Sequence, residues 1–300
     1  MAGPLQFEVP TPLQYFAALV ADDAGFSTLE AAVAVAQDDE PGLDVQAVLA
    51  EVDTLAHRLK RRVPADAAPL QRLRLLNHYF FGELGFAGNV NNYCDAANSL
   101  LPKVLVTRRG IPITLALLYI ELATQLGLHA AGVSFPGHFL VKLQLPVGDV
   151  VIDPFSGQSL TREELGERLQ PYLRQSGLMK TLRQACEGEL EAPLALFLQA
   201  ASPRDTIARL LRNLLELHRS AADLPRQQAV LQRLVVLLPE AWELRRDRAL
   251  VLAALGQTRA AADDLGTYLA RCPAAEDADR CRQWLAQWQG HGGAAGAGGH

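Results

Sequence analysis

The chain contains little cysteine and no long uninterrupted apolar segment, and both shortages exclude classes of protein. Its four cysteines, Cys94, Cys186, Cys272 and Cys281, lie among 300 residues. They are widely spaced and form no CxxC pair, so they indicate free thiols in a reducing compartment rather than a disulfide framework or a zinc site. The longest apolar run, residues 111–120, is shorter than the ~20 residues that span a bilayer. We therefore expect no metal site and no membrane association.

The sequence also lacks an excess of positive charge. Its formal net charge is -5, which gives no electrostatic footprint for nucleic acid. The one basic run, residues 57–62 (HRLKRR), continues an amphipathic helical pattern and is interpreted as a solvated helix end. The N-terminal segment has no basic stretch followed by an apolar core, so we expect no signal peptide and a cytoplasmic location.

Hydrophobic periodicity predicts helices on both sides of a short strand-rich centre. Hydrophobic residues make up 49% of the chain, enough to bury substantial cores. The predicted helices before and within the centre span residues 28–37, 44–59, 69–81 and 111–126, and the predicted strands span residues 131–135, 138–145 and 150–155. Between the third and fourth helices lies a loop rich in glycine and asparagine. Its Asn91, Asn92, Asp95 and Asn98 are expected to bond to their own backbone, and a ligand-binding role for them is the alternative.

An internal repeat occupies the C-terminal part. Its period is 34 residues, and each unit closes with a proline, which is typical of tetratricopeptide helix pairs. The repeated positions are Leu231, Val235, Leu238 and Pro239, which recur as Leu265, Leu269, Cys272 and Pro273. We predict three parts: residues 1–175 with the strand-rich centre, residues 176–290 as a helical repeat region, and residues 291–300 as a flexible tail.

Residues 107–155 carry the arrangement that bears most directly on function. A thiolate nucleophile is best made at a helix N-terminus, with a base on an adjacent strand and an acid that orients it. His138 and Asp153 supply the last two, in that chain order, after the apolar helix. The two pair directly if their hairpin is centred at residues 145–146. Centring at residues 147–148 displaces them by four residues, and the sequence does not choose between these registers.

Three segments of this stretch form a distinctive set. The motifs RRGIP, FPGHFLV and IDPF, with the helix between the first two, resemble the SirB-type family. That family combines a transglutaminase-like N-terminal domain with tetratricopeptide-like repeats. The resemblance implies an α+β fold, with a papain-like core of one buried helix against a small antiparallel sheet. It also implies that His138 and Asp153 match the catalytic histidine and aspartate of transglutaminase-like enzymes.

The nucleophile of those enzymes is absent from its usual place. Their Gly-x-Cys frame falls on Gly110-Ile111-Pro112, so Pro112 occupies the cysteine position, or Ile113 if the alignment slips by one. Cys94 and Thr114 are weaker alternates for a nucleophile. We therefore favour His138 and Asp153 as a structural pair of the core over a catalytic pair.

Two functions remain open. The favoured one is a non-catalytic scaffold or regulatory protein, which binds a protein or peptide in the former substrate cleft and needs no cofactor. The alternative is a hydrolase or acyl transferase that uses His138 and Asp153 with a displaced nucleophile or a water molecule. The candidates to line the cleft are Arg108, Arg109, Asn92, Tyr93, Asp95 and Phe135.

Overall fold

The structure is a computed structural model that describes residues 9–22, 25–175 and 191–294. The chain divides into two compact units, Gly25–Leu210 and the combination of Met1–Ala24 with Leu211–His300. This division differs from the predicted parts in two ways. The first 24 residues group with the C-terminal helices, and the boundary falls after residue 210. In the described ranges no helix is long and apolar enough to cross a membrane.

The helices of the unit Gly25–Leu210 begin where the sequence places capping residues. Ser27 and Asp44 each accept a hydrogen bond from a backbone N–H in the first turn of the helix that follows. The helix predicted at 69–81 continues from α4 into a π-helix, His78–Glu83. The helices are α2 Thr28–Val35, α3 Val45–Lys60, α4 Pro69–Asn77, α5 Leu101–Thr107, α6 Pro112–Gln125, α7 Arg162–Gln175, α9 Glu191–Phe197 and the first part of α10 Pro203–Ser220, with short 3-10 turns at Ala36–Asp38 and Ala96–Ser99.

One antiparallel sheet follows α6, with its strands in chain order. They are β3 His129–Val133, β4 Leu140–Leu145, β5 Gly148–Asp153 and β6 Gln158–Leu160. The first three correspond to the predicted strands. The short β6 was missed, as was a separate parallel pair, β1 Ala87–Gly88 with β2 Arg109–Gly110. Two- and three-residue strands are too short to show an alternating pattern, so the sequence gives no signal for them.

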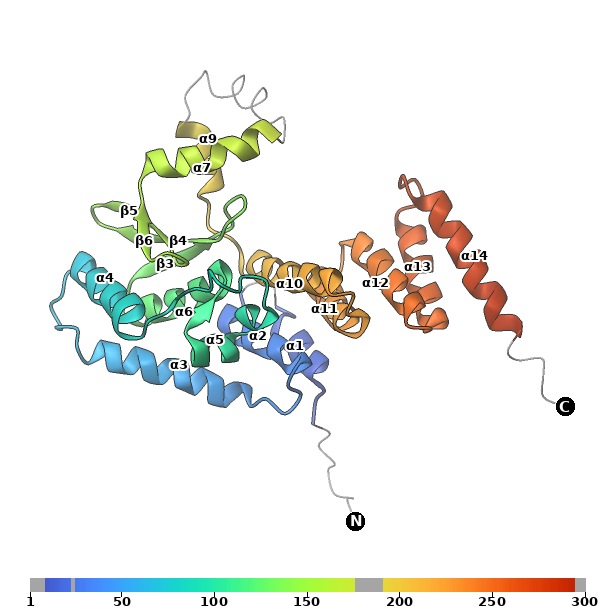
Figure 1. Ribbon diagram of the computed structural model, residues 1–300, viewed down its shortest axis with the longest axis horizontal. Helices are drawn as coiled ribbons and strands as arrows, with labels where there is room; N and C mark the ends of the chain where they lie inside the picture. The colour runs from blue at the N-terminus through green and yellow to red at the C-terminus, as the bar shows by residue number, and fades with distance from the viewer. Residues whose placement is uncertain (1–8, 23–24, 176–190, 295–300) are drawn as a thin grey trace, which may run out of the picture. The chain divides into compact units, whose positions relative to one another are not determined.

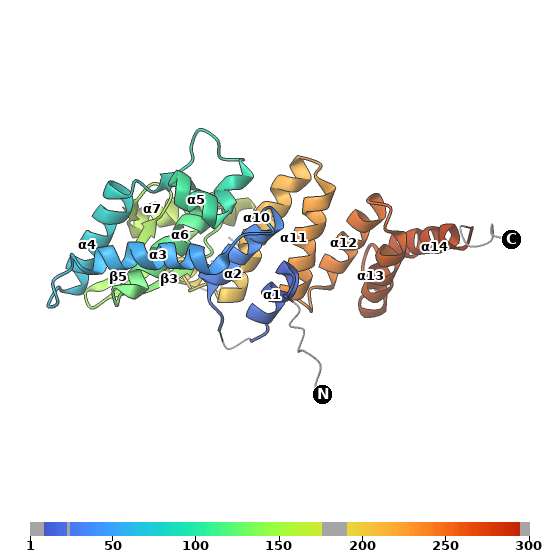
Figure 2. The ribbon, with the colours of Figure 1, turned by 90° about the horizontal axis from the view of Figure 1, so that it is seen from below.

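Helix α6 is the centre of this unit. It is buried on nearly every side, as its continuous apolar sequence predicts. Figure 1 shows α6 between α3 and the sheet, with α7 on the far side of the sheet, and Figure 2 views the same elements from the side of α3. On that far side a core joins the sheet to α7 and α9; it contains Val133, Phe135, Leu140, Val151, Leu160, Leu165, Leu169, Leu173 and Leu194. The predicted α+β class, with one buried helix against a small antiparallel sheet, is confirmed.

The other unit is entirely helical in its described part. It contains α1 Pro12–Leu19, the second part of α10, α11 Leu224–Leu237, α12 Trp242–Ala254, α13 Thr258–Arg271 and α14 Ala278–Ala294. The repeated positions lie on or directly after α11 and α13, so the predicted helix pairs are confirmed. Helix α14 is described as far as residue 294.

Helix α1 packs against the repeat helices through a buried cation–π contact. Phe16 and Arg233 both have no exposed surface. The guanidinium carbon of Arg233, on α11, lies 4.9 Å from the centre of the Phe16 ring. A cation over an aromatic face is attractive, and more so when both groups are removed from water. Helix α1 thus supplies part of the core of the C-terminal helices.

Candidate functional site

The His138 and Asp153 side chains meet at one end of the β4–β5 hairpin. Leu145 pairs with Gly148 and Val141 with Ile152, so the hairpin turns at residues 146–147. This register lies midway between the two that the sequence left open. His138 precedes β4 rather than starting it, and its Nε2 atom lies 2.8 Å from Oδ1 of Asp153. The pair therefore forms although the two residues are not direct strand partners.

The Asp153 carboxylate has three hydrogen-bond partners: His138, the Phe155 N–H and Arg168. Its exposed fraction is 4%. Oδ1 also accepts a hydrogen bond of 2.9 Å from the Phe155 N–H, and Oδ2 accepts one of 3.2 Å from Nη1 of Arg168 on α7. Burial alone would raise the pKa of Asp153, but the hydrogen bond and charge of His138, the Phe155 N–H and Arg168 together hold it well below its ordinary value. The carboxylate is thus ionised and fixed in place.

His138 keeps one ring nitrogen open. Nε2 is the ring nitrogen that faces Asp153, and in the neutral tautomer that donates to this carboxylate the lone pair is on Nδ1. The side chain is 22% exposed, and its ring contacts Phe155 with the centroids 6.5 Å apart. Within the described residues, Asp153 is the one side chain that hydrogen-bonds this ring. The imidazole is oriented as a base would be, but no described hydroxyl or thiol stands at Nδ1.

The start of α6 holds no nucleophile. Pro112 is the first helical residue, where its missing N–H leaves no bond unmade. Thr114 has no exposed surface, and its hydroxyl lies 2.8 Å from the Asn98 carbonyl oxygen and accepts a hydrogen bond of 3.2 Å from the Ile111 N–H. Gly110 is required beside it, because a Cβ there would lie 2.7 Å from the Thr114 hydroxyl oxygen. Thr114 is therefore part of the helix cap and is not placed for catalysis.

The asparagine-rich loop is held together by its own side chains, as predicted. The Asn98 side chain donates to the Asn92 carbonyl at 2.7 Å, and Asp95 accepts from the Ala97 N–H at 2.9 Å. Asn98 is buried, and its own carbonyl accepts from the cap of α6. The loop is thus a rigid extension of the helix start rather than a free binding loop.

Gly88 fixes the loop to the site. Its N–H donates a hydrogen bond of 2.9 Å to the Phe155 carbonyl. A Cβ on Gly88 would lie 2.3 Å from the Phe155 ring, so only glycine permits this approach. On the outer side, Tyr93 is 52% exposed and meets the same ring edge-on at 5.9 Å. Tyr93, Phe155 and His138 form one partly exposed aromatic surface, which we call the Phe155 surface.

The other predicted cleft residues lie apart from this surface or are covered. The Arg108 guanidinium lies over the Phe86 ring at 4.7 Å, and Arg109 donates to the Gly85 carbonyl at 2.6 Å. No described hydrogen bond or ion pair joins either arginine to Asp95 or Asp153. Phe135 has no exposed surface and belongs to the sheet core, so it does not line an open cleft. Asn92 and Asp95 hydrogen-bond each other at 3.1 Å on the loop.

The cysteines that the structure describes form no second candidate site. Cys94 is exposed on the loop next to Tyr93, and Cys186 lies outside the described residues. In the described ranges no group of three or more His, Cys, Asp or Glu side chains is arranged to hold a metal ion. Arg168 is a site residue that the sequence did not predict. The only sign of it is indirect, since a buried carboxylate such as Asp153 needs more than one partner.

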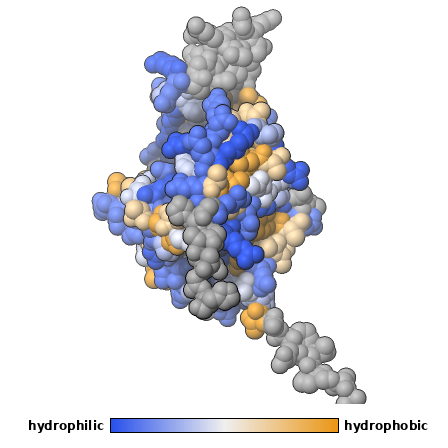
Figure 3. All heavy atoms as spheres, turned by 90° about the vertical axis from the view of Figure 1, so that its right-hand side faces the viewer, coloured by the Kyte–Doolittle hydropathy of each residue, from blue (hydrophilic) through white to orange (hydrophobic). Residues whose placement is uncertain are grey.

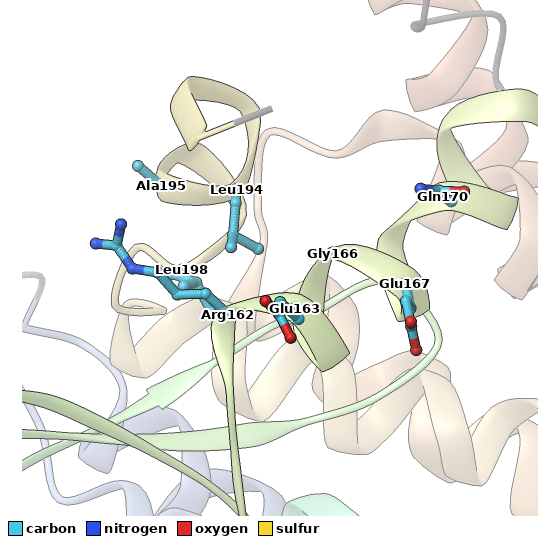
Figure 4. A pocket seen from close by; sticks show the side chains of 8 residues that line it. All are labelled: Arg162, Glu163, Gly166, Glu167, Gln170, Leu194, Ala195 and Leu198. Carbon is cyan, nitrogen blue, oxygen red and sulfur yellow. The ribbon is translucent and has the colours of Figure 1, made fainter. Parts of the chain in front are cut away.

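A cavity lies elsewhere, between α7 and α9. Its volume is about 420 Å³, and its apolar wall includes Leu194 and Leu198. Figure 4 shows the polar side chains of α7 that line it, among them Glu163 and Glu167. Arg168 is not in the lining, since it points toward Asp153 from another face of the helix. The cavity is therefore separate from the His138–Asp153 site.

Comparison with known proteins places this arrangement in a family. Residues 46–212 match the model of the transglutaminase-like superfamily, and residues 214–286 match that of the tetratricopeptide repeat. The chain is 34% identical over 265 residues to a UPF0162 protein of Xylella fastidiosa strain Temecula1, covering 88% of this chain and 90% of that one. The chain belongs to the transglutaminase-like superfamily and to the UPF0162 family.

Two further relatives show how the similarity is distributed. UPF0162 protein PA3419 of Pseudomonas aeruginosa is 32% identical over 194 residues, which cover 65% of this chain and 66% of that one. Human F-box only protein 21 is 33% identical over 161 residues, which cover 49% of this chain and 25% of that protein. No solved structure matches the chain. In UPF0162 relatives the similarity extends over most of the length, whereas in F-box only protein 21 it is confined to one part.

Proposed function

We propose that the chain is a non-catalytic, SirB-type interaction protein, which binds a segment of a partner protein at the Phe155 surface and serves a scaffold or regulatory role. The observation that carries this proposal is the start of α6. By the resemblance of the sequence to transglutaminase-like enzymes, Pro112 falls at the position of their cysteine, and the neighbouring Thr114 hydroxyl is buried and bonded on both sides. A superfamily frame without a nucleophile retains a shaped surface and loses the chemistry.

The surface beside this helix start supports binding. Tyr93 is 52% exposed although it is aromatic, and Val90 on the same loop is 78% exposed. Aromatic side chains on a rigid support are the typical anchors of protein interfaces, because little side-chain entropy is lost when they are covered. The Gly88 and Asn98 contacts supply that rigidity. Asp153 then serves to hold His138 and Phe155 in position.

The enzymatic alternative is favoured by one specific observation, the open Nδ1 of His138. Within the described residues no thiol or hydroxyl hydrogen-bonds this ring. A reaction at His138 would therefore have to use a water molecule bound at Nδ1 as the nucleophile. His138 is also not closed in by the neighbouring phenylalanines, since its side chain is 22% exposed. Hydrolysis through an activated water is therefore the second candidate.

Two tyrosines provide a matched test of binding. Tyr93 and Tyr172 are 52% and 42% exposed, and each meets one phenylalanine edge-on at 5.9 Å. Peptides selected on the full chain from a display library should bind the Tyr93→Ala variant about tenfold more weakly, as for an aromatic anchor. The Tyr172→Ala variant should bind them as the wild type does. Equal effects of the two variants would refute binding at the Phe155 surface.

The catalytic alternative has a separate test. Wild type and the His138→Ala variant are incubated with the selected peptides and with simple esters, and products are measured together with the melting temperature. Turnover by the wild type that disappears in a His138→Ala variant of unchanged melting temperature would contradict the non-catalytic proposal. We expect no turnover in either protein.

A further inference from the structure

Charge distinguishes one part of a largely polar surface from another. Figure 3, which views the molecule from the side of α14, shows a mainly hydrophilic face crossed by a narrow apolar strip. The whole chain has a net charge of -5, yet residues 57–62 (HRLKRR) contain four positively charged side chains. A local excess of positive charge in an acidic protein favours the binding of an anion at that place.

Two basic segments that are far apart in the sequence meet around one aromatic segment, residues 79–86. The basic run contributes Arg58, in the last turn of α3, and Arg62, two residues beyond that helix. Arg108 and Arg109 follow α5. We call these four side chains the arginine cluster.

Arg62 lies over the first ring of the aromatic segment. Tyr79 is 3% exposed, and its hydroxyl donates a hydrogen bond of 3.2 Å to the Leu55 carbonyl of α3. This bond fixes α3 beside the ring, and the guanidinium carbon of Arg62 lies 5.1 Å from the ring centre. Burial raises the pKa of the tyrosine hydroxyl, whereas the charges of Arg62, Arg58 and Arg108 lower it. Three of the four arginines thus lie close enough to act on the same group.

Arg108 lies over the last ring of the segment. Phe86 is 1% exposed and stacks on Phe80, and the guanidinium carbon of Arg108 lies 4.7 Å from the centre of the Phe86 ring. Arg108 ends α5 with a φ of 58°, the left-handed conformation in which glycine is usual. Its Nη1 atom is buried and has no hydrogen-bond acceptor among the described residues. A buried donor without an acceptor is unfavourable, and a bound ion or water is a usual way to satisfy it.

The cluster keeps an excess of positive charge. Within the described residues, Glu83 is the one carboxylate that forms an ion pair with it. Glu83 pairs with Arg62, and the two side chains are 38% and 51% exposed. An exposed ion pair contributes little to stability, so Arg62 can exchange Glu83 for a more highly charged anion. Arg109 is oriented by a hydrogen bond of 2.6 Å to the Gly85 carbonyl.

We propose that the arginine cluster binds a phosphate monoester, carried either by a partner protein or by a small metabolite. The planar fork of guanidinium donors matches phosphate oxygens, and arginines gathered in one place are a typical means of recognising a phosphate group. A phosphate monoester carries nearly two negative charges at neutral pH, which suits a cluster of four arginines and one carboxylate. Nucleic acid carries one charge per phosphate and is bound by an extended basic surface, whereas these arginines surround one short segment. The site uses no residue of the Phe155 surface and goes beyond the function proposed above.

A phosphopeptide tests the cluster. The probe is a labelled nine-residue peptide of glycine and serine with one central phosphoserine, and its binding to the full chain is followed by fluorescence anisotropy. Arg108→Gly should weaken binding by roughly tenfold, the effect of losing a charge-assisted hydrogen bond. Since glycine suits the left-handed backbone, this variant should keep its melting temperature. Arg62→Ala should weaken binding by roughly threefold to tenfold, and Glu83→Gln should strengthen it, because the competing carboxylate is removed.

The matched control is Arg174→Ala, which should bind the peptide as the wild type does. Arg174 is exposed on α7, which lies across the sheet from α3 (Figure 1). Competition by free O-phosphoserine separates the two sources of the phosphate group. Displacement at a concentration similar to the peptide's Kd indicates a small metabolite, and a much higher requirement indicates a protein segment.

Several results would overturn the proposal. These are equal binding of the unphosphorylated peptide, equal weakening by Arg174→Ala and Arg108→Gly, failure of Glu83→Gln to strengthen binding, and absence of binding by the wild type. Tighter binding of a short single-stranded oligonucleotide than of the phosphopeptide would also overturn it, because the cluster would then be a nucleic-acid surface. The melting temperature of each variant shows whether it is folded.

Discussion

Replacing Asp153 by alanine should destabilise the unit Gly25–Leu210 by about 2–4 kcal/mol near neutral pH. The substitution removes acceptors for the His138 ring and the Phe155 N–H, and hydrogen bonds to a charged group contribute about 1.5–3 kcal/mol each. His138 is 22% exposed, which reduces its share because water replaces part of the lost bond. Arg168 is 40% exposed, so water can replace the hydrogen bond that it loses and it adds little to the destabilisation.

The contribution of Asp153 should depend on pH with a definite sign. The folded-state pKa of this carboxyl lies below its ordinary value of 3.8. A depressed pKa means that the stabilisation is fully present above about pH 5 and is lost as the pH falls through the folded-state pKa. The difference in unfolding free energy between wild type and variant should therefore be constant from pH 7 to about pH 5 and shrink in more acidic solution.

Urea denaturation and amide hydrogen exchange together measure this effect. The chain has two compact units, so a single unfolding curve mixes them, and the exchange rate of the Phe155 amide reports the site itself. Asp149→Ala is the control, because Asp149 lies on the same strand, is 54% exposed and is 4.0 Å from Lys142. It should cost less than about 0.5 kcal/mol. An Asp153→Ala variant as stable as this control would refute the role assigned to the carboxylate.

Two further substitutions test the loop and the helix cap. Gly88→Ala should destabilise the protein by about 1–3 kcal/mol, because the new methyl group overlaps the Phe155 ring. The control is Gly166→Ala, whose methyl group meets no atom within 4 Å and which should be neutral or stabilising. Thermal unfolding of the two variants measures the difference. Thr114→Val should cost about 1–3 kcal/mol by leaving the buried Asn98 carbonyl without its hydroxyl donor, and Thr114→Ser should retain most of the stability; equal melting temperatures for the two variants would contradict this.

Much of the fold could be predicted because its signals are local. The α6 segment is apolar on nearly all sides, and its proline and terminal glycine mark both ends, so its burial and limits follow from the sequence. Asp44 and Ser27 mark helix starts in the same way. The 34-residue period alone is enough to predict the helical repeats.

The site was predictable only in part, because side-chain partners are chosen in three dimensions. His138 and Asp153 were recognised, but their register required the turn at residues 146–147. Arg168 gave no local signal, since it reaches Asp153 from a helix that follows the sheet. Phe135 looked like a cleft residue next to His138 and lies in the core, because the chain turns between the two.

The position of α1 sets an order in which the chain can complete its structure. Helix α1 leaves the ribosome before α11, which packs against it and follows some 200 residues later. At about 5–20 residues per second, Phe16 waits roughly 10–40 s for its partner during synthesis. The unit Gly25–Leu210 is continuous in sequence and can form in that interval. Helix α1 is thus made early and buried late, and a chain that stops before α11 keeps the Phe16 side chain uncovered.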